Sequence, residues 1–232
     1  MLYVTGDVHA DLRDFDERAF RKVKKTDYIV ICGDFGMIWN GDANEKKALT
    51  RLGKSHYPIL FLDGAHENFD LLSAYPVTEW HGGKAQIIDG NLIHLMRGQV
   101  YQIDDKKIFT FGGGESKDRE LREAGVSWWP QEMPNEEEMR EGIEHLVEND
   151  WTVDYIFTYE APSGMRQMLV NDDWQEELNP FQVYLDHIRE KCSFARWIFG
   201  NYHCNRRLSA NTDVVFDDVI PLISGVSKLN RK

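Results

Sequence analysis

The chain has 232 residues, of which 42% are hydrophobic and 28% are charged, and its formal net charge is -12. This composition is ordinary for a globular protein and excludes a disordered chain. The acidic balance argues against general binding to nucleic acid, because nucleic-acid phosphates are held by Lys and Arg. The longest apolar run is only strand-sized, and the three cysteines form no C-x-x-C pair. We therefore expect a cytoplasmic protein without a membrane span.

The first third of the chain alternates short apolar runs with amphipathic segments. We expect strands at Leu2 to Thr5, Tyr28 to Cys32 and Tyr57 to Leu62. We expect helices near Asp14 to Lys24, Asn44 to Ser55 and Phe69 to Ala74. Strand-helix-strand units of this length predict a parallel sheet.

The pattern changes to short alternating strands in the middle of the chain. These are expected at Gln86 to Asp89, Leu92 to Met96, Gln99 to Ile103 and Lys107 to Phe111. The turns Asp89-Gly90-Asn91, Arg97-Gly98 and Asp104-Asp105 predict antiparallel connections between them. The polar stretch Glu115 to Pro134 that follows is expected to be a long loop, a feature that is often functional.

The last part of the chain adds helices and a closing set of strands. Helices are expected at Pro134 to Asn149 and Phe181 to Cys192, and strands at Asp154 to Thr158 and Trp197 to Phe199. Closing antiparallel strands are expected at Arg207 to Ala210, Val214 to Phe216 and Val219 to Ile223. No linker or repeat interrupts this order, so we expect one domain over residues 1–232, with two sheets packed face to face and helices outside.

Four short motifs each come directly after an apolar run. They are Gly6-Asp7-Val8-His9, Gly33-Asp34, Gly64-Ala65-His66-Glu67 and Gly200-Asn201-Tyr202-His203. A strand followed at once by Gly with Asp or His places those side chains at the carboxyl edge of the sheet, where α/β proteins bind ligands. Asp and His suit a divalent cation, so four such strand ends predict a metal site.

In this order the motifs resemble those of the calcineurin-like metallophosphoesterase superfamily. Its pattern is D-x-H, G-D, G-N-H-D or G-N-H-E, a single His after a strand, and G-H-x-H, and the resemblance extends from Asp7 to His203. It implies a four-layer α/β/β/α sandwich of two mixed sheets flanked by helices. It also implies hydrolysis of a phosphate ester by water activated at a pair of metal ions that share an Asp.

The resemblance implies roles for the residues that match the motifs. The first metal site is complete, with Asp7, His9, Asp34 and His203, and Asp34 is expected to bridge. His66 is expected to protonate the leaving oxygen or hold the phosphate, and Glu67 to orient its imidazole. The alternatives are a structural His66 and a Glu67 that only favours the start of a short helix.

The second metal site departs from the family pattern. Ala65, Tyr159 and Asn201 stand where the family has Asn and two His ligands. Ala65 has no donor atom, Tyr159 binds metal only as a phenolate, and Asn201 offers a neutral carbonyl oxygen. We therefore expect about one divalent ion per chain (Mn, Fe or Zn) rather than two.

Two further groups lie in the polar stretch after the triple glycine. Ser116 and Arg119 are candidates for substrate binding, and Arg119 could hold a phosphate through two hydrogen bonds or be solvated at the surface. Trp128 and Trp129 could stack on a nucleobase or cap the core, and we favour the core.

These observations predict a metal-dependent phosphoesterase-like hydrolase that acts on a small phosphorylated substrate with a reduced one-metal centre. We expect a phosphatase, with manganese among the candidate ions. The alternative is a catalytically inactive protein of the same fold that serves as a binding or regulatory module. Intact His66 and Glu67 favour the enzyme. The choice of monoester or diester, the metal and the oligomeric state stay open.

Overall fold

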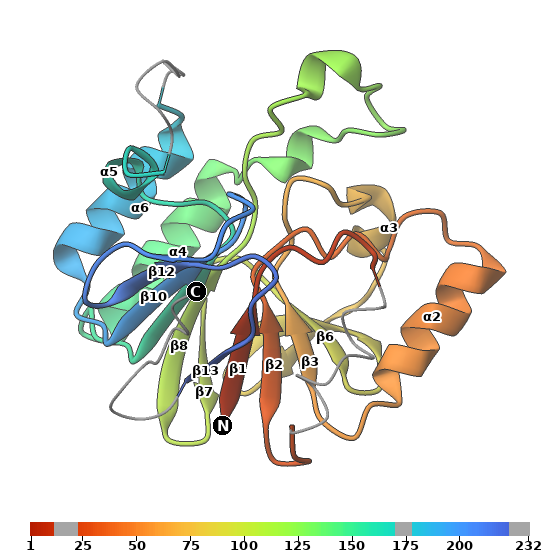
Figure 1. The fold of residues 1–232 in the computed structure, drawn as a ribbon, viewed down its shortest axis with the longest axis horizontal. Coiled ribbons are helices and arrows are strands. Elements are labelled where there is room, and N and C mark those ends of the chain that lie inside the picture. The colour runs from red at the N-terminus through yellow and green to blue at the C-terminus, as the bar shows by residue number, and fades with distance from the viewer. Residues whose placement is uncertain (12–22, 170–177, 223–232) are drawn as a thin grey trace.

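The computed structural model describes residues 1–11, 23–169 and 178–222, which form two mixed sheets packed face to face with helices on the outer faces (Figure 1). This is the predicted α/β/β/α sandwich. Most of the helix expected at Asp14 to Lys24 falls outside the described residues. In the part of the chain that is described, no helix is long and apolar enough to cross a membrane.

The first sheet has seven strands in the order β13-β1-β2-β3-β6-β5-β4. Their bounds are Leu2–Thr5 (β1), Tyr28–Ile31 (β2), Ile59–Phe61 (β3), Val77–Trp80 (β4), Gly83–Asp89 (β5), Leu92–Leu95 (β6) and Ile220–Leu222 (β13). Neighbours from β1 through β6 pair in parallel, whereas β13, β5 and β4 pair antiparallel with their neighbours. Helices α2 (Ala43–Gly53) and α3 (Phe69–Ser73) lie on the side of this sheet (Figure 1).

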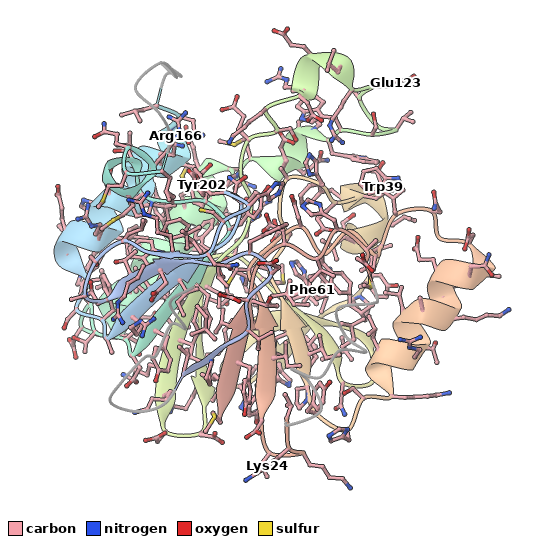
Figure 2. The ribbon with its side chains drawn as sticks, viewed as in Figure 1. Lys24, Trp39, Phe61, Glu123, Arg166 and Tyr202 are labelled. Atoms are coloured by element: carbon pink, nitrogen blue, oxygen red, sulfur yellow. The ribbon has the colours of Figure 1, made fainter. Side chains whose placement is uncertain are left out.

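The second sheet has six strands in the order β11-β12-β10-β9-β8-β7. Their bounds are Gln99–Ile103 (β7), Lys106–Phe111 (β8), Tyr155–Thr158 (β9), Arg196–Phe199 (β10), Arg206–Arg207 (β11) and Thr212–Val214 (β12). Helices α4 (Glu136–Glu148), α5 (Ser163–Arg166) and α6 (Pro180–Lys191) lie beside it (Figure 1). The loop from Glu115 to Pro134 contains only the short 3-10 helices Arg119–Leu121 and Pro130–Glu132, and Glu123 lies on its projecting part (Figure 2).

Two predicted connections are wrong. Arg97-Gly98 does not close a hairpin, because β6 belongs to the first sheet and β7 to the second. The closing strands are not all antiparallel neighbours either. Strand β12 pairs in parallel with β10, and β13 returns to the first sheet beside β1. Strand β4 has no counterpart among the predicted elements; it is an edge strand with three exposed residues and lacks a buried apolar pattern.

Three apolar clusters separate the layers. The central one lies between the sheets and contains Val30 and Leu60 of the first with Phe157 and Ile198 of the second. The outer clusters lie under α2 and α3 and under α4 and α6. Because burial of apolar surface stabilises all three interfaces, the strand ends that carry the motifs are fixed relative to one another.

Candidate metal centre

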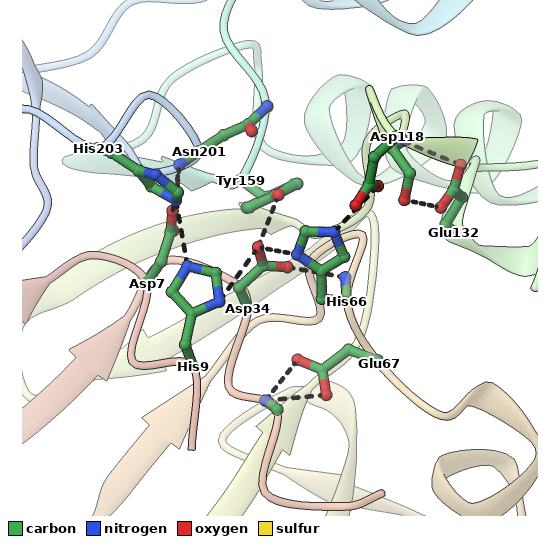
Figure 3. Close-up of polar contacts among 12 residues, drawn as sticks. Asp7, His9, Asp34, His66, Glu67, Asp118, Glu132, Tyr159, Asn201 and His203 are labelled. Carbon is green, nitrogen blue, oxygen red and sulfur yellow. Dashed lines mark hydrogen bonds and ion pairs between the residues drawn. The ribbon is translucent and has the colours of Figure 1, made fainter. Parts of the chain in front are cut away.

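Loops at the strand ends bring the motif residues together (Figure 3). Asp7 and His9 follow β1, Asp34 follows β2, His66 follows β3 and His203 follows β10. His9, Asp34 and His203 have positive φ values of 48°, 39° and 47°. Such backbone conformations are uncommon for residues with side chains and concentrate at functional sites.

The side chains of Asp7, His9 and His203 converge on one point. His9 Nε2 and His203 Nε2 are 3.1 Å apart, and His203 Nε2 is 3.3 Å from Asp7 Oδ2. Ligand atoms about 2.1 Å from one ion, at angles of about 90–109°, lie roughly 3.0–3.4 Å apart. The spacing and the donor types therefore fit a single transition-metal ion at this group.

Asp34 lies next to this group and is tied to His66. Its Oδ1 accepts from the His66 backbone amide at 2.8 Å, and its Oδ2 accepts from His66 Nδ1 at 3.0 Å. Asp34 Oδ2 is also 3.9 Å from His9 Nδ1. His9, Asp34 and His66 thus form a second group with metal-ligand spacing, which shares His9 with the first.

Burial and charge set the protonation behaviour of these groups. Burial raises the pKa of Asp7, and the hydrogen bond from His203 offsets this rise only in part. Burial also opposes ionisation of Asp34, but hydrogen bonds and charge from His66 lower its pKa below the ordinary value. Hydrogen bonds to these carboxylates raise the pKa values of His66 and His203. A buried carboxylate with a raised pKa is one that a bound cation would stabilise as the anion.

Comparison with known proteins identifies the family. The family model for calcineurin-like phosphoesterases matches residues 1–160. The chain belongs to this family. Among solved structures, it is similar to the phosphopantetheinyl hydrolase (PptH) of Mycobacterium tuberculosis, with 13% identity, a TM-score of 0.42 and coverage of 93% of this chain and 89% of that one. Comparison with curated proteins gives no match.

In this calcineurin-like phosphoesterase, Tyr159 lies beside Asp34 and Asn201 lies beside Asp7. Tyr159 is 2% exposed, and its hydroxyl donates to Asp34 Oδ2 at 2.9 Å. The backbone amide of Asn201 donates to both oxygens of Asp7, at 3.0 and 3.1 Å. The Asn201 side chain donates to Glu160 Oε2 at 3.3 Å, and Tyr202 donates to Glu160 Oε1. Burial, followed by the charge of Asp34, raises the pKa of Tyr159 well above its ordinary value.

Glu67 does not contact the imidazole of His66, so its predicted orienting role is not supported. Its buried carboxylate accepts from the Gly36 amide, at 3.2 Å to each oxygen. His66 Nδ1 pairs with Asp34 instead (Figure 3). The Glu67 side chain points away from the imidazole of His66 and toward the loop that follows β2.

The predicted substrate-binding pair has other contacts. Ser116 is buried, and both its amide and its hydroxyl donate to Glu132. Arg119 is exposed, and its guanidinium lies 4.6 Å from the ring centre of Trp128. The preference for a core role holds for Trp129, which is 4% exposed and donates from Nε1 to Asp70. Ser116 thus anchors the loop that follows β8.

The sequence analysis missed two residues of this loop that reach His66. Arg122 Nη2 is 2.9 Å from His66 Nε2, and Asp118 Oδ1 is 3.7 Å from the same nitrogen. Their i, i+4 spacing of opposite charges was the available signal, but it is common on protein surfaces. Only the course of the loop brings the pair to the metal centre.

Proposed function

We propose that the chain hydrolyses the phosphate ester of a small substrate with a single divalent ion bound by Asp7, His9, Asp34 and His203. The hydrogen bond from Tyr159 to Asp34 carries this proposal. In two-metal relatives this Asp bridges both ions, whereas here one of its oxygens accepts from a buried hydroxyl and from His66. Ala65 adds no ligand, so Asp34 keeps few contacts for a second ion.

The residues of this site fit metal-assisted hydrolysis. A divalent ion there would lower the pKa of a water molecule and polarise a phosphoryl oxygen. His66 donates from Nδ1 to Asp34, so its Nε2 is the nitrogen that faces a substrate. This orientation suits proton transfer to a leaving oxygen or a hydrogen bond to the phosphate.

The ligand types support a choice of metal to test, and the cysteines support a choice of compartment. Carboxylate and imidazole ligands suit Mn²⁺, Fe²⁺ and Zn²⁺, and we take Mn²⁺ as the ion to test first. The three cysteines are free, which agrees with a reducing cytoplasm. The net charge of -12 opposes general nucleic-acid binding, so the expected substrate is small.

Metal content and hydrolysis test the proposal together. After metal removal and reloading with Mn²⁺, mass spectrometry of the parent should give about one ion per chain, and His203→Ala should lose it. The triple variant Ala65→Asn, Tyr159→His, Asn201→His should bind two. His66→Ala should slow hydrolysis of p-nitrophenyl phosphate or its diester roughly a hundredfold or more, with metal content unchanged.

Arg140→Ala is the control, because Arg140 lies on the exposed face of α4. Two tightly bound ions in the parent would contradict the one-metal centre. A parent without hydrolytic activity, beside an active triple variant, would instead establish the inactive binding module.

A further inference from the structure

The loop after β8 places a guanidinium against His66. Arg122 Nη2 donates to His66 Nε2 at 2.9 Å, and this is the nitrogen that faces the substrate in the proposed function. The Arg122 side chain is 21% exposed and the His66 side chain 30%, so the contact lies at the solvent boundary of the metal centre. A ligand that reaches His66 therefore also meets Arg122.

Asp118 fixes the direction of this guanidinium. Its two oxygens accept from Arg122 Nε at 2.6 Å and from Nη2 at 2.7 Å, and Ser127 O accepts from Nη1 at 3.0 Å. A planar guanidinium held on two sides loses less freedom when it binds an anion than a free side chain does. The hydrogen on Nη2 that is not bonded to Asp118 points at His66.

The loop itself is attached to the body of the protein at several points. Glu132 is 1% exposed and accepts from the Ser116 amide at 3.0 Å. Arg97 Nη2 donates to the backbone carbonyls of Gln131 and Glu132, and Trp129 donates to Asp70 at 2.8 Å. These contacts hold Asp118 and Arg122 beside the candidate metal centre.

We propose that Arg122 binds the phosphoryl oxygens of the substrate and that Asp118 positions its guanidinium. This deepens the proposed function and rests on it. An anionic phosphoryl oxygen is a better acceptor for a guanidinium than a neutral imidazole nitrogen. The substrate phosphate therefore accepts the Nη2 hydrogen bond in place of His66. Nε2 of His66 is then free to take up a proton from solvent and to pass it to the leaving oxygen.

The same geometry gives a preference for the substrate class. Because Asp118 pairs with Arg122, the guanidinium supplies a directed hydrogen-bond donor beside the ion and little net charge. A phosphate monoester has more free oxygens than a diester to accept both from this donor and from the ion, so it gains more from the arrangement. Arg122 therefore favours monoesters.

Binding of inorganic phosphate tests the proposal independently of turnover. Calorimetric titrations compare the parent with Arg122→Ala, Arg122→Lys, Asp118→Asn and the surface control Arg140→Ala, each in Mn²⁺-loaded and metal-free form. Loss of a charged hydrogen bond predicts about ten- to hundredfold weaker phosphate binding in Arg122→Ala. Arg122→Lys should lose less phosphate affinity, because lysine keeps the positive charge but lacks the paired N–H donors of the guanidinium. Metal content and the Arg140→Ala affinity should match the parent.

Rescue separates a binding role from a structural one. Free guanidinium ions should restore part of the phosphate affinity of Arg122→Ala and leave Arg140→Ala unaffected. If Arg122→Ala fails to fold by circular dichroism, the comparison passes to Arg122→Lys and Asp118→Asn, both of which must weaken phosphate binding.

Three results would overturn the proposal. The first is that folded Arg122 variants bind phosphate as tightly as the parent. The second is that Arg119→Ala weakens phosphate binding as much as Arg122→Ala does. The third is that the parent binds phosphate neither with Mn²⁺ nor without metal. Phosphate that binds through Arg122 to a chain without hydrolytic activity would instead support this inference and refute the proposed hydrolase. The monoester preference is overturned if the ratio of kcat/KM for p-nitrophenyl phosphate over its diester is the same in Arg122→Ala and the parent.

Discussion

Glu67 supports the loop that carries Asp34. It is 1% exposed, and burial, followed by the charge of Asp34, raises its pKa well above the ordinary value. Its carboxylate accepts from the amide of Gly36, a residue with a φ of +67°. Glu67 thus satisfies the amide of Gly36 in a left-handed turn two residues after the expected bridging ligand Asp34.

Glu67→Ala should lower the free energy of unfolding by about 1–3 kcal/mol, because the Gly36 amide loses its acceptor. Glu67→Gln should lose less, since its amide oxygen still accepts. Urea unfolding measures both, and Glu79→Ala, at an exposed position of β4, should stay within about 0.5 kcal/mol of the parent. If Glu67→Ala is as stable as the parent but hydrolyses substrate more slowly, Glu67 would instead act by orienting His66.

At the scale of elements, the connection between β6 and β7 decides how the two sheets join. Gly98 has a φ of +70°, and a Cβ at this position would come within 2.9 Å of Gly142 Cα and 3.0 Å of the Glu138 carbonyl oxygen. Helix α4 therefore packs directly on the turn. Glycine is needed there both for the backbone conformation and for the close approach.

Gly98→Ala should destabilise the protein by roughly 2–4 kcal/mol, through backbone strain and overpacking against α4. Gly82→Ala is the matched control: its φ is +87°, and nothing lies within 4 Å of the added Cβ. It should cost only about 1–2 kcal/mol of strain. If urea unfolding gives the same loss of stability for Gly98→Ala and Gly82→Ala, the close packing of α4 on Gly98 does not contribute.

The parallel strands and the meeting of Asp7, His9 and Asp34 at one sheet edge were predictable because they depend on local patterns. An apolar run followed by Gly and Asp or His marks a strand end, and strand ends of one sheet meet at one edge. Arg97-Gly98 was not predictable, because a turn within a hairpin and a turn between sheets share the same residue types. Arg122 was missed for a related reason: its partner His66 lies 56 residues away, and no local pattern encodes that contact.

At the scale of the whole molecule, a buried polar network joins the first sheet, the connection to the second sheet and α4. Asp63, after β3, accepts from His94 Nε2 at 3.1 Å and from Arg97 Nε and Nη2 at 2.9 and 2.6 Å. Arg97 also donates to Glu138 of α4 at 3.0 Å. Burial alone would raise the pKa of Asp63, but the charge of Arg97 and the hydrogen bond from His94 lower it from 3.8 to about 2.

A lowered pKa in the folded state stabilises the protein above the unfolded value of 3.8, and this stability is lost as the pH falls toward about 2. At pH 7, Asp63→Asn should therefore cost at least about 2 kcal/mol. The difference in free energy of unfolding between Asp63→Asn and the parent should narrow when unfolding is measured from about pH 5 down to about pH 3. Asp105→Asn, with a side chain 82% exposed, should show no such closing gap. A difference in free energy of unfolding that does not change with pH would exclude stabilisation by the ionised Asp63.

The hydrogen bonds of Tyr159 and Asn201 also constrain how this sequence can change. The ring of Tyr159 fills the space beside Gly33, while Asn201 and Tyr202 both donate to Glu160. Replacing Tyr159 takes a donor from buried Asp34, and replacing Asn201 takes one from buried Glu160, so each change alone lowers stability. A sequence with histidine at both positions is therefore reached only through less stable single-step intermediates.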